Sequence, residues 1–298
     1  MPKVSICIPT FNRMDYLKET LASVFAQTFQ DYEVMVIDDG STDGTREMIE
    51  SLSLPVNYIY QENAGTSACR NRFIDLARGE YLAFLDSDDL YYPDSIERLY
   101  GSIEPYGGKA CAYGGYIRID QAGREMATRP KMAVLPSGNI SRDLFKTIIV
   151  HPGGSMYPLA VLKESPGFDP RLRVCCDYDL ELALSLKYPF IAQQKPTFKR
   201  RRHGSNVSAE SFENLQDKAK VLRRFLYERG GEKVIPEQEA ARRLGRLFYR
   251  MGLCAYRERL DRATVRECFG QSMESDFKLK TLLRSVLATL DPVFRFTF

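Results

Sequence analysis

The first hundred residues alternate short runs of apolar, β-branched residues with segments in which apolar residues recur at helical spacing. This alternation predicts a parallel sheet flanked by helices, because parallel strands need a crossover between them. The run at 34–37 is apolar without alternation, as expected for a strand covered on both faces. The sequence therefore predicts an α/β fold with a doubly wound, mainly parallel sheet. The predicted strands are 4–9, 34–37, 56–60 and 81–85, and the predicted helices are 17–25, a short one ending near 52, and 67–77.

Beyond residue 110 the pattern is less regular. Residues 110–119 and 192–199 predict strands, and residues 177–186 predict a helix. The segment 123–138 is rich in Pro, Gly and charged residues, so we expect a loop there. After residue 209 apolar residues recur at helical spacing only, which predicts a C-terminal helical appendage.

The charge distribution sets the same C-terminal segment apart. Residues 210–298 hold 18 Lys and Arg against 13 Asp and Glu, a net charge of +5; the whole chain carries +3, so residues 1–209 carry −2. The overall balance is too near zero for a protein that coats nucleic acid, and we expect no nucleic-acid partner. The predicted organisation is one domain at 1–209 followed by a helical region at 210–298.

The cysteine pattern and the N-terminal sequence indicate in which cellular compartment the protein is expected. The seven cysteines are an odd number without a C-x-x-C pair, and an ordinary disulfide between the adjacent Cys175 and Cys176 is geometrically awkward. We therefore expect free thiols in a reducing cytoplasm. The chain begins with a strand pattern rather than a signal-peptide pattern, and no apolar run approaches the roughly 18–20 residues of a spanning helix. Any contact with a membrane is expected from its surface.

Polar and acidic residues follow each predicted strand at the point where the strand ends. They are Pro9-Thr10-Phe11-Asn12 after the first strand, Asp38-Asp39-Gly40-Ser41 after the second, Asn63-Ala64-Gly65 and then Arg70 after the third, and Asp86-Ser87-Asp88-Asp89 after the fourth. In an open doubly wound sheet, ligands bind outside the carboxyl ends of the strands. The sequence therefore predicts a ligand site at this edge.

Five of these residues are aspartates, and five carboxylates at one edge would raise one another's pKa unless a positive group joined them. A divalent cation would do so. Hard oxygen ligands without paired His or Cys residues favour Mg²⁺ or Mn²⁺ over zinc, and such ions bridge carboxylates to substrate phosphates. The predicted ligand is therefore a nucleotide. An isolated Asp-x-Asp is more often a turn or a helix cap. The prediction rests on the position of Asp86 and Asp88 directly after an apolar strand, since Asp38 and Asp39 follow another strand in the same way.

Four segments also carry a resemblance: SICIPTFN at 5–12, VIDDGSTD at 36–43, NAGTSACRN at 63–71 and GEYLAFLDSDD at 79–89. In order and spacing they resemble family 2 glycosyltransferases, which have the GT-A fold. The resemblance covers residues 4 to about 95 and resumes at 167–172, 176–180 and 203–206. It implies a nucleotide-binding half at 1–109 and an acceptor-binding half at 110–209.

The resemblance implies roles for individual residues. The residues expected to bind the nucleotide are Pro9, Thr10, Phe11, Asp38, Asp39, Arg70 and Asp86. Asp88 is expected to bind the metal on the diphosphate, and His203 to lie near the leaving diphosphate. Asp177 matches the aspartate of the family's Glu-Asp pair, the general base, while Cys176 replaces the glutamate and puts a supporting acceptor contact in question. Without the resemblance, Asp177 and Asp179 would be interpreted as partners of a helix dipole.

These roles imply an inverting, metal-dependent glycosyltransferase of the hexosyltransferase type. With Mn²⁺ or Mg²⁺, it would transfer a sugar from a nucleoside-diphosphate sugar, most simply a UDP-sugar, to a hydroxyl of a glycan or lipid-linked acceptor in polysaccharide or glycolipid synthesis. One alternative is a sugar nucleotidyltransferase, which would need a Gly-rich basic loop in place of 9–12. The other is a non-catalytic subunit that binds nucleotide-sugar or serves as a scaffold, which would lack Asp88 or Asp177.

Two basic segments allow more than one interpretation. The run KRRRH at 199–203 is either a solvated surface or a phosphate clamp, and the clamp fits a glycosyltransferase. Residues 277–298 combine Lys and Arg with an apolar and aromatic cluster, which suits either a membrane-surface anchor or a helix packed on the domain or on a second subunit of a homo-oligomer. An anchor would place a cytoplasmic enzyme peripherally on the inner face of the cytoplasmic membrane.

Overall fold

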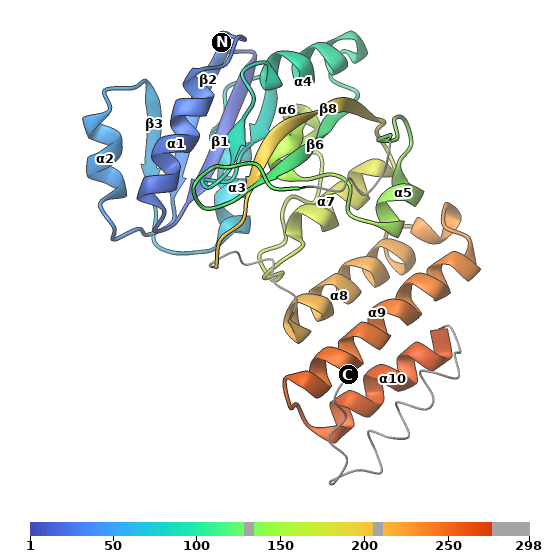
Figure 1. Ribbon diagram of the computed structural model, residues 1–298. Helices are drawn as coiled ribbons and strands as arrows, with labels where there is room; N and C mark the ends of the chain where they lie inside the picture. Colours follow the sequence, from blue (N-terminus) through green and yellow to red (C-terminus); the bar gives the residue numbers. More distant parts are fainter. Residues whose placement is uncertain (128–133, 205–210, 276–298) are drawn as a thin grey trace. The chain divides into compact units, whose positions relative to one another are not determined.

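The computed structural model describes residues 1–127, 134–204 and 211–275. The chain divides into two compact units, Met1–Asn206 and Val207–Phe298, and Figure 1 colours the sequence from blue at the N-terminus to red. The first unit contains the strands and the helices α1 to α7, and the second contains α8 to α10. The predicted site residues therefore all belong to the first unit.

Over the described residues, eight strands form one mixed sheet in the order β3-β2-β1-β4-β7-β6-β8-β5. The strands from β3 to β4 in this order are parallel, as predicted, and β6 and β8 are also parallel to each other. Strands β7 and β5 are antiparallel to their neighbours. The strands are β1 (Val4–Thr10), β2 (Tyr32–Asp38), β3 (Val56–Tyr60), β4 (Tyr81–Phe84), β5 (Leu90–Tyr91), β6 (Cys111–Ile119), β7 (Ser155–Pro158) and β8 (Phe190–Arg201).

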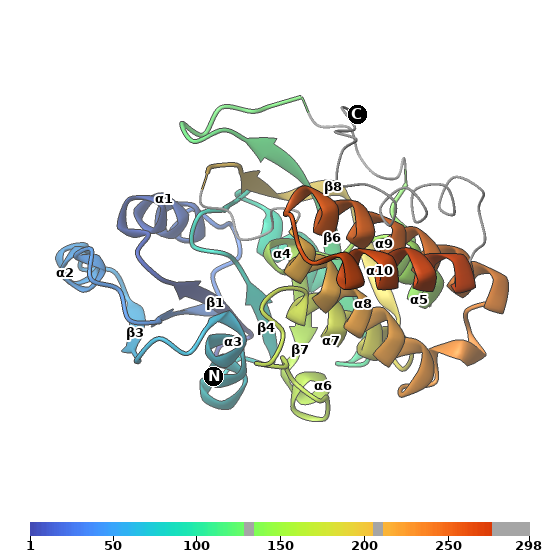
Figure 2. The same cartoon turned by 90° about the horizontal axis from the view of Figure 1, so that it is seen from below.

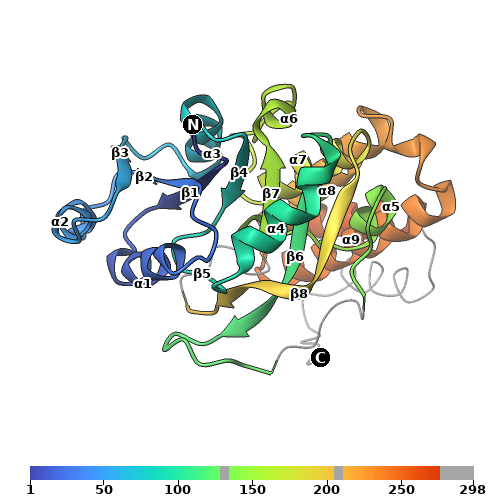
Figure 3. The same ribbon diagram turned by 90° about the horizontal axis from the view of Figure 1, so that it is seen from above.

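Helices cover both faces of the sheet, and Figure 2 shows α1 and α3 on opposite sides of β1. On one face Ile6 of β1 shares a buried cluster with Leu17 of α1 and Leu99 of α4, and Figure 3 shows α4 alongside β6 and β8. On the other face the ring of Phe84 in β4 lies 6.4 Å from that of Phe73 in α3. This two-sided burial explains why β1 is buried along its whole length. The helices of this unit are α1 (Met14–Phe25), α2 (Thr45–Ser51), α3 (Thr66–Leu76), α4 (Ser95–Ile103), α5 (Ser141–Lys146), α6 (Leu159–Lys163) and α7 (Cys176–Ser185).

The predicted α/β class and its mainly parallel N-terminal strands are confirmed. The strand predicted at 192–199 is longer than expected, because it extends from Phe190 to Arg201. The sequence pattern missed β5 and β7, which have two and four residues, because so few residues show no period. In the predicted loop, the described residues 123–127 and 134–138 form only isolated bridges, at Glu125 and Gly138.

The second unit is helical over its described residues, with α8 (Phe212–Tyr227), α9 (Glu237–Arg257) and α10 (Arg262–Ser275). Ser211 caps α8, since its hydroxyl accepts the backbone N–H of Asn214 at 3.2 Å. Helices α9 and α10 approach closely at Gly252, where a Cβ would lie 2.7 Å from the ring of Phe269. In the part of the chain that the structure describes, no helix is long and apolar enough to cross a membrane. The segment 277–298, predicted as an anchor or a packed helix, lies outside the described residues.

Gly79, in the turn before β4, offers a test of the packing at the start of the sheet. A Cβ at Gly79 would lie 2.6 Å from the backbone nitrogen of Ser5 and 2.8 Å from the backbone carbon of Val4, and backbone atoms cannot move aside as a flexible side chain can. We expect Gly79→Ala to lower the free energy of unfolding by about 1–3 kcal/mol. Chemical denaturation of the full chain measures this change.

The matched control for this prediction is Gly101→Ala in α4. A Cβ at Gly101 meets no atom within 4 Å, so the control adds the same methyl group in open space. We expect it to stabilise the protein by up to about 1 kcal/mol, the gain in helix propensity from Gly to Ala. Equal effects of the two substitutions would contradict the assigned contact of Gly79 with β1.

Candidate active site

The carboxyl ends of β1, β2 and β4 lie at one edge, because these strands are parallel and adjacent. Pro9 and Thr10 end β1, Thr10 pairs in register with Asp38, and Phe11 follows with 46% of its surface exposed. Thr10 is 3% exposed, and its hydroxyl has no hydrogen-bond partner among the described residues. A buried hydroxyl without a partner is costly, and a hydrogen bond to a ligand group would remove this cost.

Asp38 and Asp39, at the end of β2, are buried and shape the loops around them. Asp38 accepts the hydroxyl of Tyr58 at 2.7 Å. Burial and this hydrogen bond raise the pKa of Tyr58 to about 12, so the phenol stays protonated and continues to donate. Asp39 accepts the backbone N–H groups of Ala64 and Gly65 at 2.9 and 2.8 Å. The two aspartates therefore fix the loop after β3, and their predicted contacts with a nucleotide stay predictions.

Arg70 of α3 joins the acidic turn after β4 to the start of α7. Its Nη2 donates to Asp86 Oδ1 at 3.0 Å and its Nη1 donates to the Cys176 sulfur at 3.6 Å, while its Nε has no hydrogen-bond partner among the described residues. Burial alone would lower the pKa of Arg70, but Asp86, Cys176 and Asp177 raise it overall. Arg70 is therefore a permanent cation with one N–H left for a ligand.

Asp177 stands in the first turn of α7 and is partly exposed, whereas Asp179 is 1% exposed. Only Asp177 of this pair is accessible enough to meet a substrate, which agrees with the preference for Asp177 drawn from the sequence. Cys175 precedes the helix with φ = +63°, a left-handed conformation that is uncommon outside glycine. Such backbone conformations often occur at functional sites, where surrounding contacts maintain them.

Three side chains converge at the acidic turn: Asp88, Arg13 and His203. Asp88 Oδ2 lies 2.8 Å from Arg13 Nη1 and 2.6 Å from His203 Nε2, and the two nitrogens are 2.6 Å apart. Exposed fractions of the side chains are 13%, 19% and 3% for Asp88, Arg13 and His203. The structure thus brings the predicted metal ligand and the predicted diphosphate residue together. Arg13 was not among the predicted site residues, although it directly follows the matched segment 5–12.

No protonation state of His203 satisfies all three contacts. If Nε2 carries a proton it can donate to Asp88, but it then faces the donor-only guanidinium of Arg13. If Nε2 is unprotonated it accepts from Arg13, and its lone pair then faces the Asp88 carboxylate. A carboxylate oxygen and an imidazole nitrogen that point to one place are instead a suitable pair of ligands for a divalent transition ion such as Mn²⁺. The residues present therefore fit a divalent cation.

Two protein ligands do not complete a coordination sphere. In the part of the chain that the structure describes, no group of three or more His, Cys, Asp or Glu side chains could hold a metal ion. Ions of the Mg²⁺ type are commonly bound by one or two protein groups together with water and substrate phosphates. A cation at Asp88 and His203 would therefore depend on a diphosphate for tight binding.

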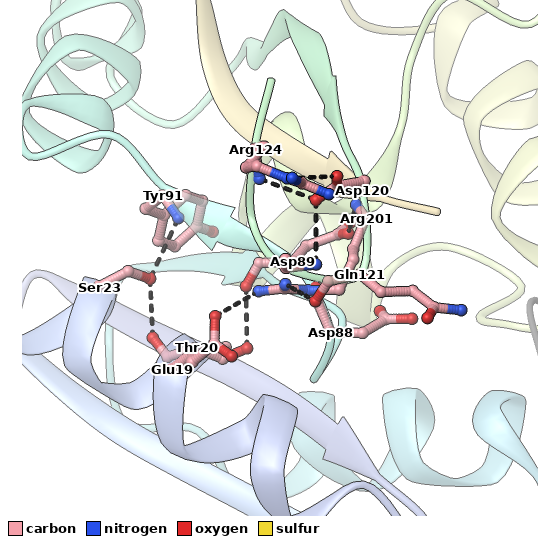
Figure 4. A network of polar contacts seen from close by, with 11 residues as sticks. Glu19, Thr20, Ser23, Asp88, Asp89, Tyr91, Asp120, Gln121, Arg124 and Arg201 are labelled. Atoms are coloured by element: carbon pink, nitrogen blue, oxygen red, sulfur yellow. Dashed lines mark hydrogen bonds and ion pairs between the residues drawn. The ribbon is translucent and has the colours of Figure 1, made fainter. Parts of the chain in front are cut away.

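Arg201 lies against the acidic turn, next to Asp88 and Asp89, as Figure 4 shows. Its side chain is fully buried, its Nε donates to the Asp88 carbonyl at 3.0 Å, and its Nη2 pairs with Glu19 at 2.6 Å. Its backbone N–H donates to Asp89 Oδ1 at 2.9 Å, and its Nη1 donates to the Gln121 carbonyl at 2.8 Å. Within the basic run 199–203, Arg201 therefore holds the turn in place and is too deeply buried to act as a surface cation.

The expected repulsion among five aspartates at this edge is largely met by the protein itself. Each aspartate has its own donor in the structure: Tyr58 for Asp38, Ala64 and Gly65 for Asp39, Arg70 for Asp86, Arg13 for Asp88, and Arg201 for Asp89. Burial still raises the pKa of Asp89, and the charges of Asp88 and Asp86 add to the shift. Charge repulsion alone therefore does not demand a cation; the convergence of Asp88 and His203 is the stronger argument.

A further buried acid lies one helical turn after Asp177. Glu181 is 1% exposed, accepts the Tyr157 hydroxyl at 3.1 Å through Oε1, and has no partner at Oε2 among the described residues. Burial, and next the charge of Asp177, raise the pKa of Glu181 well above its usual range. The raised pKa favours the neutral form of Glu181, and the neutral form spares Asp177 a second negative charge nearby. No sequence pattern pointed to this role beyond the four-residue spacing from Asp177.

We expect Glu181→Gln to change how stability depends on pH. The folded protein keeps the Glu181 proton above the pH at which the unfolded chain loses it, so this residue lowers the free energy of unfolding as pH rises above about 4.3. The amide has no such proton, and the melting temperature of the variant relative to the native protein should therefore increase from pH 5 to pH 8. Thermal melts at several pH values measure this difference.

Glu62→Gln is the control for the same loss of a carboxyl group, since Glu62 is exposed. Its melting temperature should follow that of the native protein across the same pH range. A difference between Glu181→Gln and the native protein that stays constant with pH would show that Glu181 is ionised in the folded state.

A doubly wound sheet whose carboxyl edge gathers an Asp-x-Asp turn, an arginine and a histidine is the arrangement of GT-A glycosyltransferases. The profile of the family Glycosyl transferase family 2 matches residues 5–165, and the chain belongs to that family. The resemblance drawn from the sequence is confirmed.

Relatives and solved structures agree with this family. The chain is 29% identical over 233 residues to an uncharacterized glycosyltransferase of Rickettsia typhi, covering 76% of this chain and 72% of that protein. It is 30% identical over 216 residues to chondroitin synthase of Escherichia coli, covering 72% of this chain but 31% of that enzyme.

Two solved structures show the same fold. S. aureus TarS (residues 1–349) in complex with UDP-GlcNAc has a TM-score of 0.67 at 18% identity, covering 92% of this chain and 81% of that one. The mannosyltransferase PcManGT of Pyrobaculum calidifontis, in complex with GDP-Man and Mn²⁺, has a TM-score of 0.63 at 17% identity, covering 96% of this chain and 80% of that one.

Proposed function

We propose that this glycosyltransferase transfers a sugar from UDP-sugar to a hydroxyl of a glycan or lipid-linked acceptor, with inversion and with help from Mn²⁺ or Mg²⁺. The observation that carries the proposal is the convergence of Asp88 and His203 at the edge that also bears Thr10, Arg70 and Asp177. This convergence supports a site in which Asp88 and His203 serve the diphosphate, Thr10 and Arg70 serve the nucleotide, and Asp177 is the general base.

The donor half of the site is residues 1–109 in this proposal. The unpaired Thr10 hydroxyl and the unpaired Nε of Arg70 offer polar contacts to a nucleotide, with Pro9, Phe11, Asp38, Asp39 and Asp86 around them. TarS binds UDP-GlcNAc on the same fold, which supports a uridine nucleotide, while PcManGT binds GDP-Man and makes guanosine the competing choice.

Asp88 and His203 would hold the cation in this proposal. When bound, a divalent cation offsets the negative charge that develops on the leaving diphosphate. His203 is held for this task by Tyr16, whose ring stacks on it at 5.1 Å, and Arg201 in turn lies 4.8 Å from the centre of the Tyr16 ring. Arg201 also fixes the backbone of Asp88, so both ligands depend on the same buried cation.

Asp177 is the proposed general base. The acceptor oxygen attacks the anomeric carbon as the bond to the diphosphate breaks, and Asp177 takes the hydroxyl proton. Arg70 lies near Asp177 and Asp86 together, so it orients the base relative to the donor side. A single displacement inverts the anomeric configuration, because no second carboxylate is assigned as a nucleophile.

The acceptor half is residues 110–209 in this proposal, and residues 210–298 form a region that contacts a membrane or another subunit. Chondroitin synthase, which acts in polysaccharide synthesis by its name, supports a glycan acceptor. A lipid-linked acceptor would bring the enzyme to a membrane surface.

Calorimetric titration with nucleotides tests the donor. We expect UDP to bind in the presence of Mn²⁺ at least about tenfold more tightly than GDP or TDP, and to weaken when the metal is left out, because the diphosphate shares the cation with Asp88 and His203. Preference for GDP would show that the donor carries guanine rather than uracil, and the proposed transfer reaction would still stand. If none of the three nucleotides binds, the donor-binding proposal is wrong and a non-catalytic scaffold becomes the better description.

Asp177→Asn separates chemistry from donor binding. The amide keeps the shape of the side chain but cannot take a proton, so turnover should fall by about 10²- to 10⁴-fold while UDP affinity stays within about twofold. Hydrolysis or transfer from radiolabelled UDP-sugars measures turnover, and calorimetry measures affinity. Asp75→Asn, an exposed carboxylate on α3, is the control and should leave both unchanged. Full turnover by the Asp177 variant would place the base elsewhere.

A further inference from the structure

The backbone next to Arg13 is hydrogen-bonded to the loop after β2, at the edge of the sheet where the nucleotide is proposed to bind. Asn12, with φ = +49°, donates its N–H to the Ser41 hydroxyl at 2.8 Å, and its side-chain oxygen accepts the N–H of Thr42 at 2.8 Å. These bonds connect the end of β1 to the loop after β2. The backbone at Arg13 is therefore fixed by the same loops that shape the predicted nucleotide site, and any movement of Arg13 must occur in its side chain.

The Arg13 guanidinium reaches from this anchor to the ligands proposed for the cation. Its Nη1 lies 2.8 Å from Asp88 Oδ2 and 2.6 Å from His203 Nε2, and its side chain is 19% exposed. A guanidinium can donate to both atoms, but only if both are acceptors. The 2.6 Å contact between Asp88 Oδ2 and His203 Nε2 then brings two lone pairs together. Arg13 thus neutralises Asp88 without fully satisfying the pair.

A divalent cation and the guanidinium cannot occupy this place together. A metal ion accepts lone pairs from both Asp88 and His203, which removes the conflict between them, and it carries twice the charge of Arg13. Two positive groups within about 4 Å at a partly buried site repel each other by several kcal/mol. Binding of the ion therefore requires the Arg13 side chain to leave Asp88, and the lost ion pair opposes metal binding.

We propose that Arg13 and a divalent cation are alternative partners of Asp88 and His203, so that Arg13 keeps the metal affinity of the nucleotide-free enzyme low. This inference rests on the cation site in the proposed function. It assigns to Arg13 the role of an internal competitor. A diphosphate shifts the balance, because it supplies further ligands to the cation and a new anionic partner for the released guanidinium at the same edge.

Mn²⁺ titration of the 298-residue chain without nucleotide tests this proposal. Electron paramagnetic resonance counts free Mn²⁺ and needs no enzymatic activity. We expect Arg13→Gln to bind Mn²⁺ about tenfold or more tightly than the native protein, the change that corresponds to about 1.4 kcal/mol. Arg13→Lys keeps a competing positive charge, so its affinity should stay near the native value.

Two controls make the result specific. Arg78→Gln removes the exposed guanidinium that pairs with Glu33, and it should leave Mn²⁺ affinity unchanged if the effect is local rather than a change in net charge. Combining Arg13→Gln with Asp88→Asn should abolish the gain, because the carboxylate that binds the ion is lost. Thermal melts of each variant confirm that it is folded.

The outcomes separate this inference from the proposed function. If Arg13→Gln binds Mn²⁺ no more tightly than the native protein, while the native protein with UDP does bind Mn²⁺, Arg13 is not a competitor and the metal-dependent reaction still stands. If neither the native protein nor Arg13→Gln binds Mn²⁺ even with UDP present, both the competition and the metal dependence are wrong. In that case UDP binding without metal would assign Arg13 as the resident cation of the site.

Discussion

The site depends on one buried cation, Arg201. Its side chain is fully buried and donates hydrogen bonds to the Asp88 carbonyl, the Glu19 carboxylate and the Gln121 carbonyl. Glu19 is 51% exposed, so water weakens its ion pair with Arg201, while the buried guanidinium itself still needs an acceptor for each of its donors. Arg201 therefore ties the end of β8 to α1 and to the turn after β4. His203, two residues later, reaches Asp88 as a consequence of this connection.

The sequence predicted the parts of the site that are local. The short apolar strands and the acidic turns after them lie within the first hundred residues. Each turn directly follows its strand in the sequence, so predicting the strand also predicts where the turn lies. Parallel pairing then brings Thr10, Asp38 and Asp86 to one edge without further information, because the carboxyl ends of adjacent parallel strands coincide. The mixed part of the sheet was less visible, since β5 and β7 are too short to show a period.

The contacts that the sequence did not show are those between distant segments. Asp88 and His203 are 115 residues apart, and Arg13 and His203 are 190 apart. Their meeting depends on how β8 pairs with β6 and β5, which no local pattern encodes. The five carboxylates do crowd one edge, but the sequence pattern could not show the donors that relieve most of their repulsion, because donors such as Arg201 come from outside the acidic turns.

The replacement of the family's glutamate by Cys176 changes how Arg70 is balanced. A thiol is a weak acceptor, and burial raises the pKa of Cys176, so Arg70 faces a neutral sulfur at 3.6 Å where a carboxylate would have given a full charge. Arg70 is left with Asp86 as its close carboxylate partner among the described residues, and with an unused Nε. A buried guanidinium that is only partly neutralised attracts an anionic or polar ligand more strongly than a fully paired one would. The substitution therefore leaves Arg70 less fully paired, next to Asp177, the base in the proposed function.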